Sequence, residues 1–202
     1  EGSDYITTLW VNGQYAGSHR GGYARFSFDI TNLLHDGENE LTVKVEDSFD
    51  TQQPRGKQRW MDHNFLCFYV QTTGIWKTVW SEYVPQCSIV GVKMTPNMNE
   101  FTLKLEFDVD APACTMNGEL LLETVITYQD SLVSRSFTAV TASRVTATAD
   151  MTLMGDEGHY YNGPVWTPGR PNLYDVQLRL VRNGQILDEV GSYAAMRDIR
   201  ID

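Results

Sequence analysis

The sequence predicts an all-β protein. Apolar and polar residues alternate through most of the chain, and the longest perfect alternation covers residues 101–109. Five Asx-Gly pairs separate the alternating runs, and such pairs supply the positive φ that tight hairpin turns need. No stretch has the apolar spacing of an amphipathic helix. Only residues 30–37, "ITNLLHDG", are expected to form a single helical turn.

The expected strands can be justified in chain order. Residues 24–30 and 41–45 alternate between apolar and polar side chains, and a long polar loop with glycine and proline follows at 47–63. The stretch 71–80, "QTTGIWKTVW", is rich in β-branched and aromatic residues. Simple alternation would place Trp76, Thr78 and Trp80 on one face of a strand there, and would place Ile75, Lys77 and Val79 on the other.

Two domains are predicted, residues 1–85 and 86–202, with a boundary at Pro85. The later part holds about seven short strands, including the alternating run 176–180, which is the size and pattern of an immunoglobulin-like β-sandwich. It lacks the Cys…Trp…Cys pattern of antibody domains. The first part holds only four or five strands, too few for a closed sandwich, and we interpret it as the later portion of a larger all-β domain.

Composition excludes several classes of partner. The formal net charge is −10, without the basic patch that nucleic acid or an anionic membrane attracts. No apolar run approaches the roughly 20 residues of a transmembrane helix. The cysteines Cys67, Cys87 and Cys114 form no CxxC pair, and we expect three free thiols.

Sequence motifs give no support for a cofactor or a metal. The four histidines are scattered without the spacing of a zinc site, and no GxSxG, P-loop or GxGxxG motif occurs. Acidic residues in and near the 47–63 loop could bind a hard cation such as calcium, but solvated loop charges are the more common reading of such residues. We therefore predict no bound cofactor and no metal site.

Several motifs in order resemble family 2 glycoside hydrolases, the β-galactosidase and β-glucuronidase group. They are "VNGQ", "GGYARFSFDIT", "GENELTVKVED", "QPRGKQRW", "TTGIWKTVWSEYV", "VWTPGRPNLYDVQLRL" and "GSYAAMRDIRID". The resemblance covers nearly the whole chain. It implies that a partial sugar-binding jelly roll precedes an immunoglobulin-like sandwich.

The resemblance also places catalysis outside this chain. Retaining glycosidases use two carboxylates about 5–5.5 Å apart, and in this family both are glutamates on a β/α barrel that follows the immunoglobulin-like domain. No Asn-Glu acid/base motif is identified here, because Asn39-Glu40 and Asn99-Glu100 lie in hairpin or strand contexts. We therefore predict no catalytic residue in the chain, which would be an inactive piece of a larger enzyme and would orient its barrel.

Substrate contacts are expected mainly from the long loop. Arg55, Lys57 and Trp60 combine hydrogen-bond donors with an aromatic face, the usual means of holding a sugar, and Gln71 stands where relatives often carry arginine. Phe68 stands where relatives carry a sugar-binding aspartate, which argues against strict galactosidase or glucuronidase specificity. In the alternative interpretation, Trp60 packs the loop onto the sheet and the basic side chains stay solvated.

Two functional hypotheses follow. In the first, the chain is the non-catalytic part of a bacterial β-glycosidase that acts on terminal β-linked sugars, in the cytoplasm or periplasm. In the second, it is a stand-alone carbohydrate-binding or adhesive module, which would bind an oligosaccharide through Trp60. The abrupt end of "MRDIRID" at a strand favours the first hypothesis.

Overall fold

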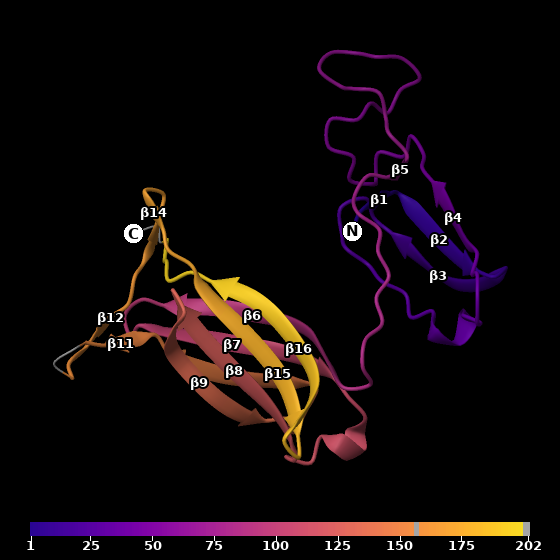
Figure 1. Ribbon diagram of the computed structural model, residues 1–202. Coiled ribbons are helices and arrows are strands. Elements are labelled where there is room, and N and C mark those ends of the chain that lie inside the picture. Colours follow the sequence, from indigo (N-terminus) through magenta and orange to yellow (C-terminus); the bar gives the residue numbers. More distant parts are fainter. Residues whose placement is uncertain (156–157, 200–202) are drawn as a thin grey trace. The chain divides into compact units, whose positions relative to one another are not determined.

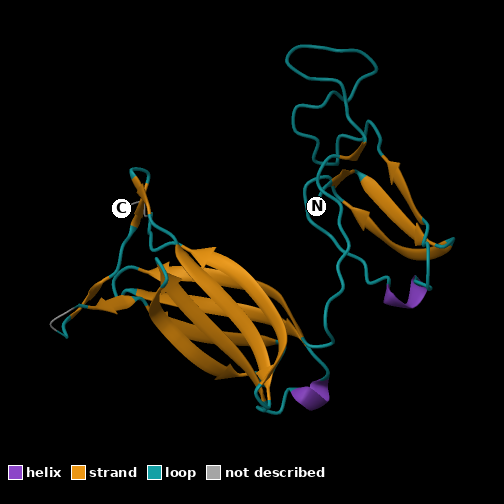
Figure 2. Ribbon diagram, viewed as in Figure 1, coloured by secondary structure: helices purple, strands orange, loops and turns teal. Residues whose placement is uncertain are grey.

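The computed structural model describes residues 1–155 and 158–199 and confirms the all-β fold class (Figures 1 and 2). The chain divides into two compact units, Glu1–Glu82 and Tyr83–Asp202. The helical turns that the structure describes are η1 (Thr31–Leu33), inside the predicted 30–37 turn, and η2 (Ala113–Thr115). None of the described helices has the length and apolar character needed to span a membrane.

The first unit is built on a three-stranded antiparallel sheet in the order β3-β2-β4. β2 (Ile6–Val11) lies in the centre, between β3 (Gln14–Arg20) and β4 (Leu41–Glu46). The turn between β2 and β3 is Asn12-Gly13, with φ of 51° and 77°, as the Asx-Gly signal predicts. A second pair joins β1 (Ser3–Asp4) to β5 (Gly74–Ile75), so the two ends of this unit meet.

The strand predicted at residues 24–30 is wrong, because these residues form no strand. Their aromatic side chains instead pack onto β3. The Phe26 ring stacks on His19 with centroids 4.2 Å apart, and Phe28 covers Gly17 so closely that a Cβ there would lie 2.4 Å from the Phe28 ring. The alternation of apolar and polar residues indicated which side chains face the sheet. Among the described residues, however, the backbone of 24–30 pairs with no strand.

The second unit is a β-sandwich, as predicted (Figure 2). Its sheets are ordered β10-β7-β6 and β16-β15-β8-β9. Inward-facing side chains of both sheets form one apolar core, in which Phe107, Leu122 and Leu178 are fully buried. The strands are β6 (Ser88–Asn97), β7 (Thr102–Asp110), β8 (Leu120–Tyr128), β9 (Ser131–Ala139), β10 (Arg144–Asp150), β15 (Tyr174–Arg182) and β16 (Gln185–Ala194).

Short hairpins extend the chain between β10 and β15. They pair β11 (Thr152–Met154) with β12 (Tyr160–Asn162), and β13 (Trp166–Thr167) with β14 (Arg170–Pro171). The pair Asn162-Gly163 does not form the expected tight turn. Gly163 instead lies beneath a side chain, because a Cβ on it would be 2.5 Å from the Tyr174 hydroxyl.

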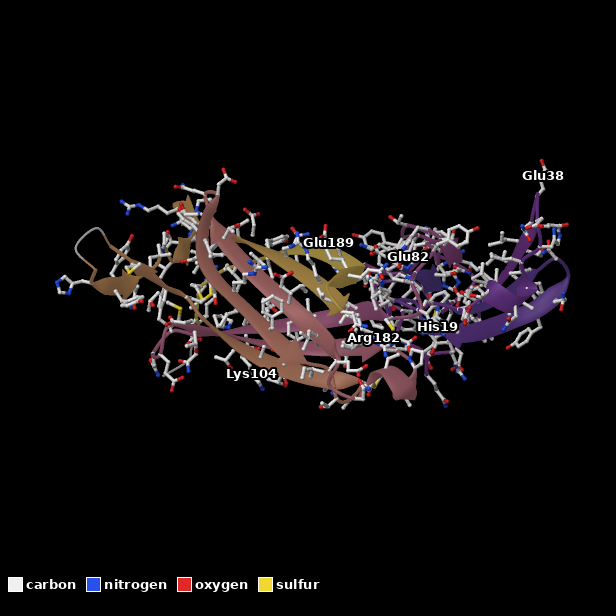
Figure 3. All side chains as sticks on the ribbon, turned by 60° about the horizontal axis from the view of Figure 1, so that its bottom comes forward. His19, Glu38, Glu82, Lys104, Arg182 and Glu189 are labelled. Atoms are coloured by element: carbon white, nitrogen blue, oxygen red, sulfur yellow. The ribbon has the colours of Figure 1, made fainter. Side chains whose placement is uncertain are left out.

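One charged cluster is set into the outer face of the four-stranded sheet. Glu123 is buried on β8, and its carboxylate accepts a hydrogen bond of 2.8 Å from Arg135 Nε on β9. Arg179 on β15 approaches the other carboxylate oxygen at 3.5 Å and pairs also with Glu189 on β16. Glu189 is labelled in Figure 3. The cluster ties together all four strands of the sheet.

Cys67 is an exposed free thiol and Cys87 is a buried one. The expectation for Cys114 cannot be compared, since its side chain lies outside what the structure describes.

Candidate functional site

The candidate site is the long segment of residues 47–73, which leaves β4 and returns to the sheet at β5. Both ends of the segment are held by Asp47. One carboxylate oxygen accepts a bond of 2.5 Å from Gln53 Nε2, and the other accepts one of 3.3 Å from the Thr73 hydroxyl. Long connections of this kind are often functional when they are structured.

Arg55 is the buried centre of this loop, with 7% of its surface exposed. Its guanidinium donates to three backbone carbonyls: those of Ser48, of Asp50 at 2.8 Å and of Arg59 at 3.2 Å. Five donors in a rigid fork suit this task. The structure therefore places Arg55, a predicted substrate-contact residue, inside the loop, where its hydrogen bonds hold the backbone.

Gln58 connects the loop to the sheet. Its amide nitrogen donates to the Asp4 carboxylate at 2.8 Å, and its amide oxygen accepts from the Thr72 backbone at 2.8 Å. Asp4 is itself 6% exposed and lies directly against Gly22, where a Cβ would be 2.5 Å from its carboxylate. Gln58 therefore connects the loop both to β1, through Asp4, and to the end of the long segment, through Thr72.

Gln71 is bound within the loop too. Its side-chain oxygen accepts a hydrogen bond of 2.8 Å from Arg59 Nε, and the same guanidinium donates to Asn64 at 2.9 Å. The backbones also pair here, because Arg59 N donates to Tyr69 O at 2.7 Å and Tyr69 N donates to Lys57 O at 2.8 Å. The side chain of Gln71 is therefore occupied in bracing the loop.

Trp60 lies in an aromatic cluster with Phe65 and Phe68. Its ring meets theirs edge-on, with centroids 4.9 Å and 4.5 Å away. Trp60 remains partly exposed, whereas Lys57 is exposed and its ammonium has no partner in the part of the chain that the structure describes. Of the predicted substrate-contact residues, Lys57 and Trp60 are therefore the two whose side chains are accessible to a ligand.

The loop's remaining charges are mostly solvated. His63 hydrogen-bonds to Asp62 at 2.7 Å, and this bond holds the pKa of the Asp62 carboxyl below its usual range. Within residues 1–155 and 158–199, no three His, Cys, Asp or Glu side chains gather as a metal site would require. The chemistry offered by the loop is hydrogen bonding and aromatic contact.

The second unit uses its "PNLY" segment structurally. Asn172 accepts a bond of 2.9 Å from the Tyr128 hydroxyl and donates one of 2.9 Å to Val165 O. Tyr174 is fully buried and donates to Pro164 O at 2.8 Å. The Arg197 guanidinium lies 4.3 Å from the centre of the Trp166 ring. These contacts fix the backbone of the "PNLY" segment where it enters β15.

Sequence reasoning missed Asp4 and Arg59 as organisers of the loop. Asp4 lies 54 positions from its partner Gln58, and no pattern in the local sequence predicts a contact over that separation. Arg59 lies in the motif "QPRGKQRW", which could have indicated its role, but the sequence prediction names only Arg55, Lys57 and Trp60 of that motif.

These features define a module of two all-β units, in which a strand-poor unit with an organised loop precedes a complete sandwich. Residues 1–81 match the family model for the sugar binding domain of glycosyl hydrolases family 2, and residues 87–197 match a second model of glycosyl hydrolases family 2. The chain therefore belongs to glycosyl hydrolases family 2.

Known relatives are much longer proteins. A Formosa agariphila protein, provisionally named a β-glucuronidase, is 27% identical over 198 residues, which cover 98% of this chain and 22% of that protein. A β-galactosidase of Thermoanaerobacter pseudethanolicus is 26% identical over 206 residues, covering 98% of this chain and 25% of that protein. The chain thus spans about a quarter or less of the length of these relatives.

The crystal structure of a Bacteroides uniformis β-glucuronidase contains a region similar to both units. It is 25% identical, with a TM-score of 0.71, and the match covers all of this chain and 24% of that one. Both units are therefore found together within a larger glycosidase.

Proposed function

We propose that this chain is the non-catalytic portion, residues 1–85 and 86–202, of a bacterial retaining β-glycosidase acting on terminal β-linked sugars. In this proposal the two units orient a catalytic barrel elsewhere in the same polypeptide. The single observation that carries the proposal is the coverage: two consecutive family models match, while the glycosidases to which the chain is similar are about four times longer.

We infer that the loop contributes one wall of the sugar site. Lys57 and Trp60 would face the substrate, since the ammonium of Lys57 is unpaired among the described residues and part of the Trp60 ring is exposed. Arg55 and Gln71 would act indirectly by holding the loop backbone. An ammonium and an aromatic face are groups that bind sugar hydroxyls and sugar faces, respectively.

The proposal is tested by comparing residues 1–202 with the whole protein encoded by the gene, each assayed with nitrophenyl β-galactoside and β-glucuronide. We expect release by the whole protein only, because the chain has no assigned acid/base or nucleophile. Release of nitrophenol by purified residues 1–202 would refute the assignment.

The loop's part is tested separately in the whole protein with Lys57→Met. Loss of one charged hydrogen bond to substrate should raise KM by roughly tenfold, corresponding to about 1.4 kcal/mol. Leu132→Ala is the matched control, since Leu132 is exposed on β9 in the second unit. An unchanged KM in Lys57→Met would remove this residue from the sugar site.

A further inference from the structure

Gly191 is a glycine that the fold of the second unit does not require. It lies inside β16, and a glycine weakens a strand because it has no side chain to pack. Its φ is outside the left-handed region, a Cβ built on it would meet no atom within 4 Å, and the bulge of its strand pair lies elsewhere, at Leu180/Val181. Within a strand, such a glycine often marks a place where a ligand approaches the backbone.

An open hollow of about 570 Å³ adjoins Gly191 on the outer face of the four-stranded sheet. The strand register places Gln177 directly opposite Gly191. Tyr193, Asp175 and Thr127 form the neighbouring row on the same face. The hollow is therefore lined from three adjacent strands, β16, β15 and β8, and its volume falls in the range of roughly 300–1,000 Å³ that sites for small ligands have.

The side chains around this hollow leave hydrogen-bonding groups unoccupied. Among the residues that the structure describes, the side chains of Gln177, Asp175 and Thr127 form no hydrogen bond or ion pair. Together they offer an amide that donates and accepts, a carboxylate that accepts, and a hydroxyl that does both. Tyr193, which is 66% exposed, adds an aromatic ring. Such a combination suits a ligand with several hydroxyl groups and an apolar ring face.

The charges around the hollow favour an uncharged ligand. The cation in its lining, Arg179, already pairs with Glu189 and Glu123. The Asp175 carboxylate has no cationic partner among the described residues and would repel a carboxylate or phosphate on a ligand. A protein partner is disfavoured as well, because it would bury the Gln177 amide and the Asp175 carboxylate under a surface that is usually poor in charged groups.

We propose that the outer face of the β16-β15-β8-β9 sheet binds a small neutral saccharide in this hollow. The side chains of Gln177, Asp175 and Thr127 hydrogen-bond to its hydroxyl groups, Tyr193 contacts a sugar ring, and Gly191 leaves the space that the ligand occupies. This site is separate from the sugar contacts proposed for the loop of the first unit, and it breaks no bond. It holds a saccharide on the second unit.

The test titrates the complete 202-residue chain with three neutral disaccharides, lactose, cellobiose and maltose, and follows the backbone amide resonances by NMR. We expect at least one of them to shift the resonances of Gln177, Gly191 and Tyr193 with a Kd on the order of 1 mM, since few contacts must offset the entropy lost on association. The absence of shifts at these residues with all three sugars, up to about 50 mM, would overturn the proposal.

Substitution of Gly191 separates this site from any other sugar contact. Gly191→Leu fills the hollow and should weaken binding by at least about tenfold, while leucine suits the strand better than glycine does. Gly91→Leu is the matched control, because Gly91 lies on β6 of the other sheet and a Cβ there also meets no atom within 4 Å. Its affinity should equal that of the native chain. Native affinity in Gly191→Leu would overturn the proposal.

A second variant keeps the test decisive if Gly191→Leu does not fold. Gln177→Leu removes the amide opposite Gly191 and should also weaken binding by at least about tenfold, because the sugar loses its hydrogen bonds and meets an apolar group. Native affinity in that variant overturns the proposal. So do sugar-induced shifts confined to the loop of the first unit. Shifts at Gln177 and Tyr193 that follow the chain concentration without sugar also overturn it, since a second copy would then be the occupant.

Discussion

Arg55 illustrates how one side chain organises a long loop. The residue is nearly buried, yet among the described residues its guanidinium forms no ion pair with an acidic side chain, and the groups it binds are the backbone carbonyls of Ser48, Asp50 and Arg59. The loop's shape therefore depends on a buried charge that is held by backbone dipoles at its terminal nitrogens, while its Nε has no hydrogen-bond partner among the described residues.

Replacing Arg55 tests this role. Arg55→Met should lower the free energy of unfolding of the first unit by about 2 kcal/mol, because it removes charge-assisted hydrogen bonds and leaves carbonyls without a donor. Urea denaturation followed by tryptophan fluorescence measures the change. Lys57→Met, which alters an exposed side chain of the same loop, should leave stability unchanged. Equal effects of the two substitutions would show that Arg55 is not the organiser.

Tyr174 gives a prediction about alkaline pH. Its burial, with smaller contributions from Tyr128 and Tyr161, raises the pKa of its phenol to about 12 from the ordinary 10.0. Because the folded state holds the proton more tightly than the unfolded state, this stabilisation is complete below pH 10 and is lost as pH rises toward 12. Stability should therefore fall across that range.

The measurement compares urea unfolding at pH 9 and pH 11. The native chain should lose more stability between these values than Tyr174→Phe, which has no phenol to ionise. Tyr193→Phe serves as the control, since Tyr193 is 66% exposed. An identical loss in the native chain and in Tyr174→Phe would be inconsistent with a protonated, buried Tyr174.

At the scale of elements, the outer face of the four-stranded sheet depends on Glu123. Only 5% of its side chain is exposed, although neighbouring Arg135 is 56% exposed. A buried carboxylate between guanidiniums contributes little net stability as a pair, but removing its charge leaves the partners uncompensated. Side chains of all four strands meet at this position, in addition to the backbone ladders that pair the strands.

Glu123→Gln should therefore lower the free energy of unfolding of the second unit by about 2 kcal/mol. The effect should persist in 0.5 M NaCl, since salt screens buried pairs weakly. Glu119→Gln, which removes the exposed carboxylate paired with Arg182 (labelled in Figure 3), should cause no measurable change. Urea denaturation followed by far-UV circular dichroism measures both variants, and a neutral Glu123→Gln would contradict the argument.

Elements differed in how well the sequence predicted them. Alternation correctly indicated β4, β7 and β15, since successive side chains of a strand point to opposite faces, although only on β7 and β15 does one of those faces lie in a core. It failed at residues 24–30, where the aromatic side chains cover a sheet while the backbone pairs with no strand. It failed again at Trp76 and Lys77, because their backbone N–H groups both donate to Gly2 O, and this β-bulge places two consecutive side chains on one side.

The candidate site was harder to predict. Residue types in "QPRGKQRW" indicated a polar, aromatic loop, and the loop has that composition. Whether a given donor points outward or inward depends on its partners in the fold, such as Asp4, which lies 54 positions from Gln58, and the Ser48 carbonyl, which turns Arg55 into the loop. Local sequence carries no record of those contacts, so the roles of Arg55 and Gln71 could not be assigned from it.

At the scale of the whole molecule, apolar burial is uneven. The continuous core lies entirely between Cys87 and Met196. In residues 1–82 the buried hydrophobic side chains are only Tyr5 and Val11, and Leu41 and Val43 on β4 are 51% and 41% exposed. Since hydrophobic burial is the main favourable term in folding, the first unit should be the less stable one.

Unfolding should accordingly occur in two steps, with the first unit melting at lower urea. Four of the five tryptophans lie in residues 1–82, so Trp166→Phe converts fluorescence into a reporter of that unit alone. The fluorescence midpoint should precede the main far-UV circular dichroism transition, which reports chiefly the sandwich. Coincident midpoints would instead indicate one cooperative unit.

The border strands of the sheets are protected differently in the two units. The two sheets of the sandwich approach one another along both borders, β10 beside β9 and β16 beside β6, and at the second border the Asp188 carboxylate accepts from Ile89 N at 2.8 Å. The unpaired backbone groups at these two borders are therefore largely inaccessible to other molecules. In the first unit β3 and β4 are open borders, guarded on β4 by the charges of Lys44 and Glu46. In crowded solution, any fibrous aggregation should therefore begin in the first unit, and neutralising those two charges should hasten it.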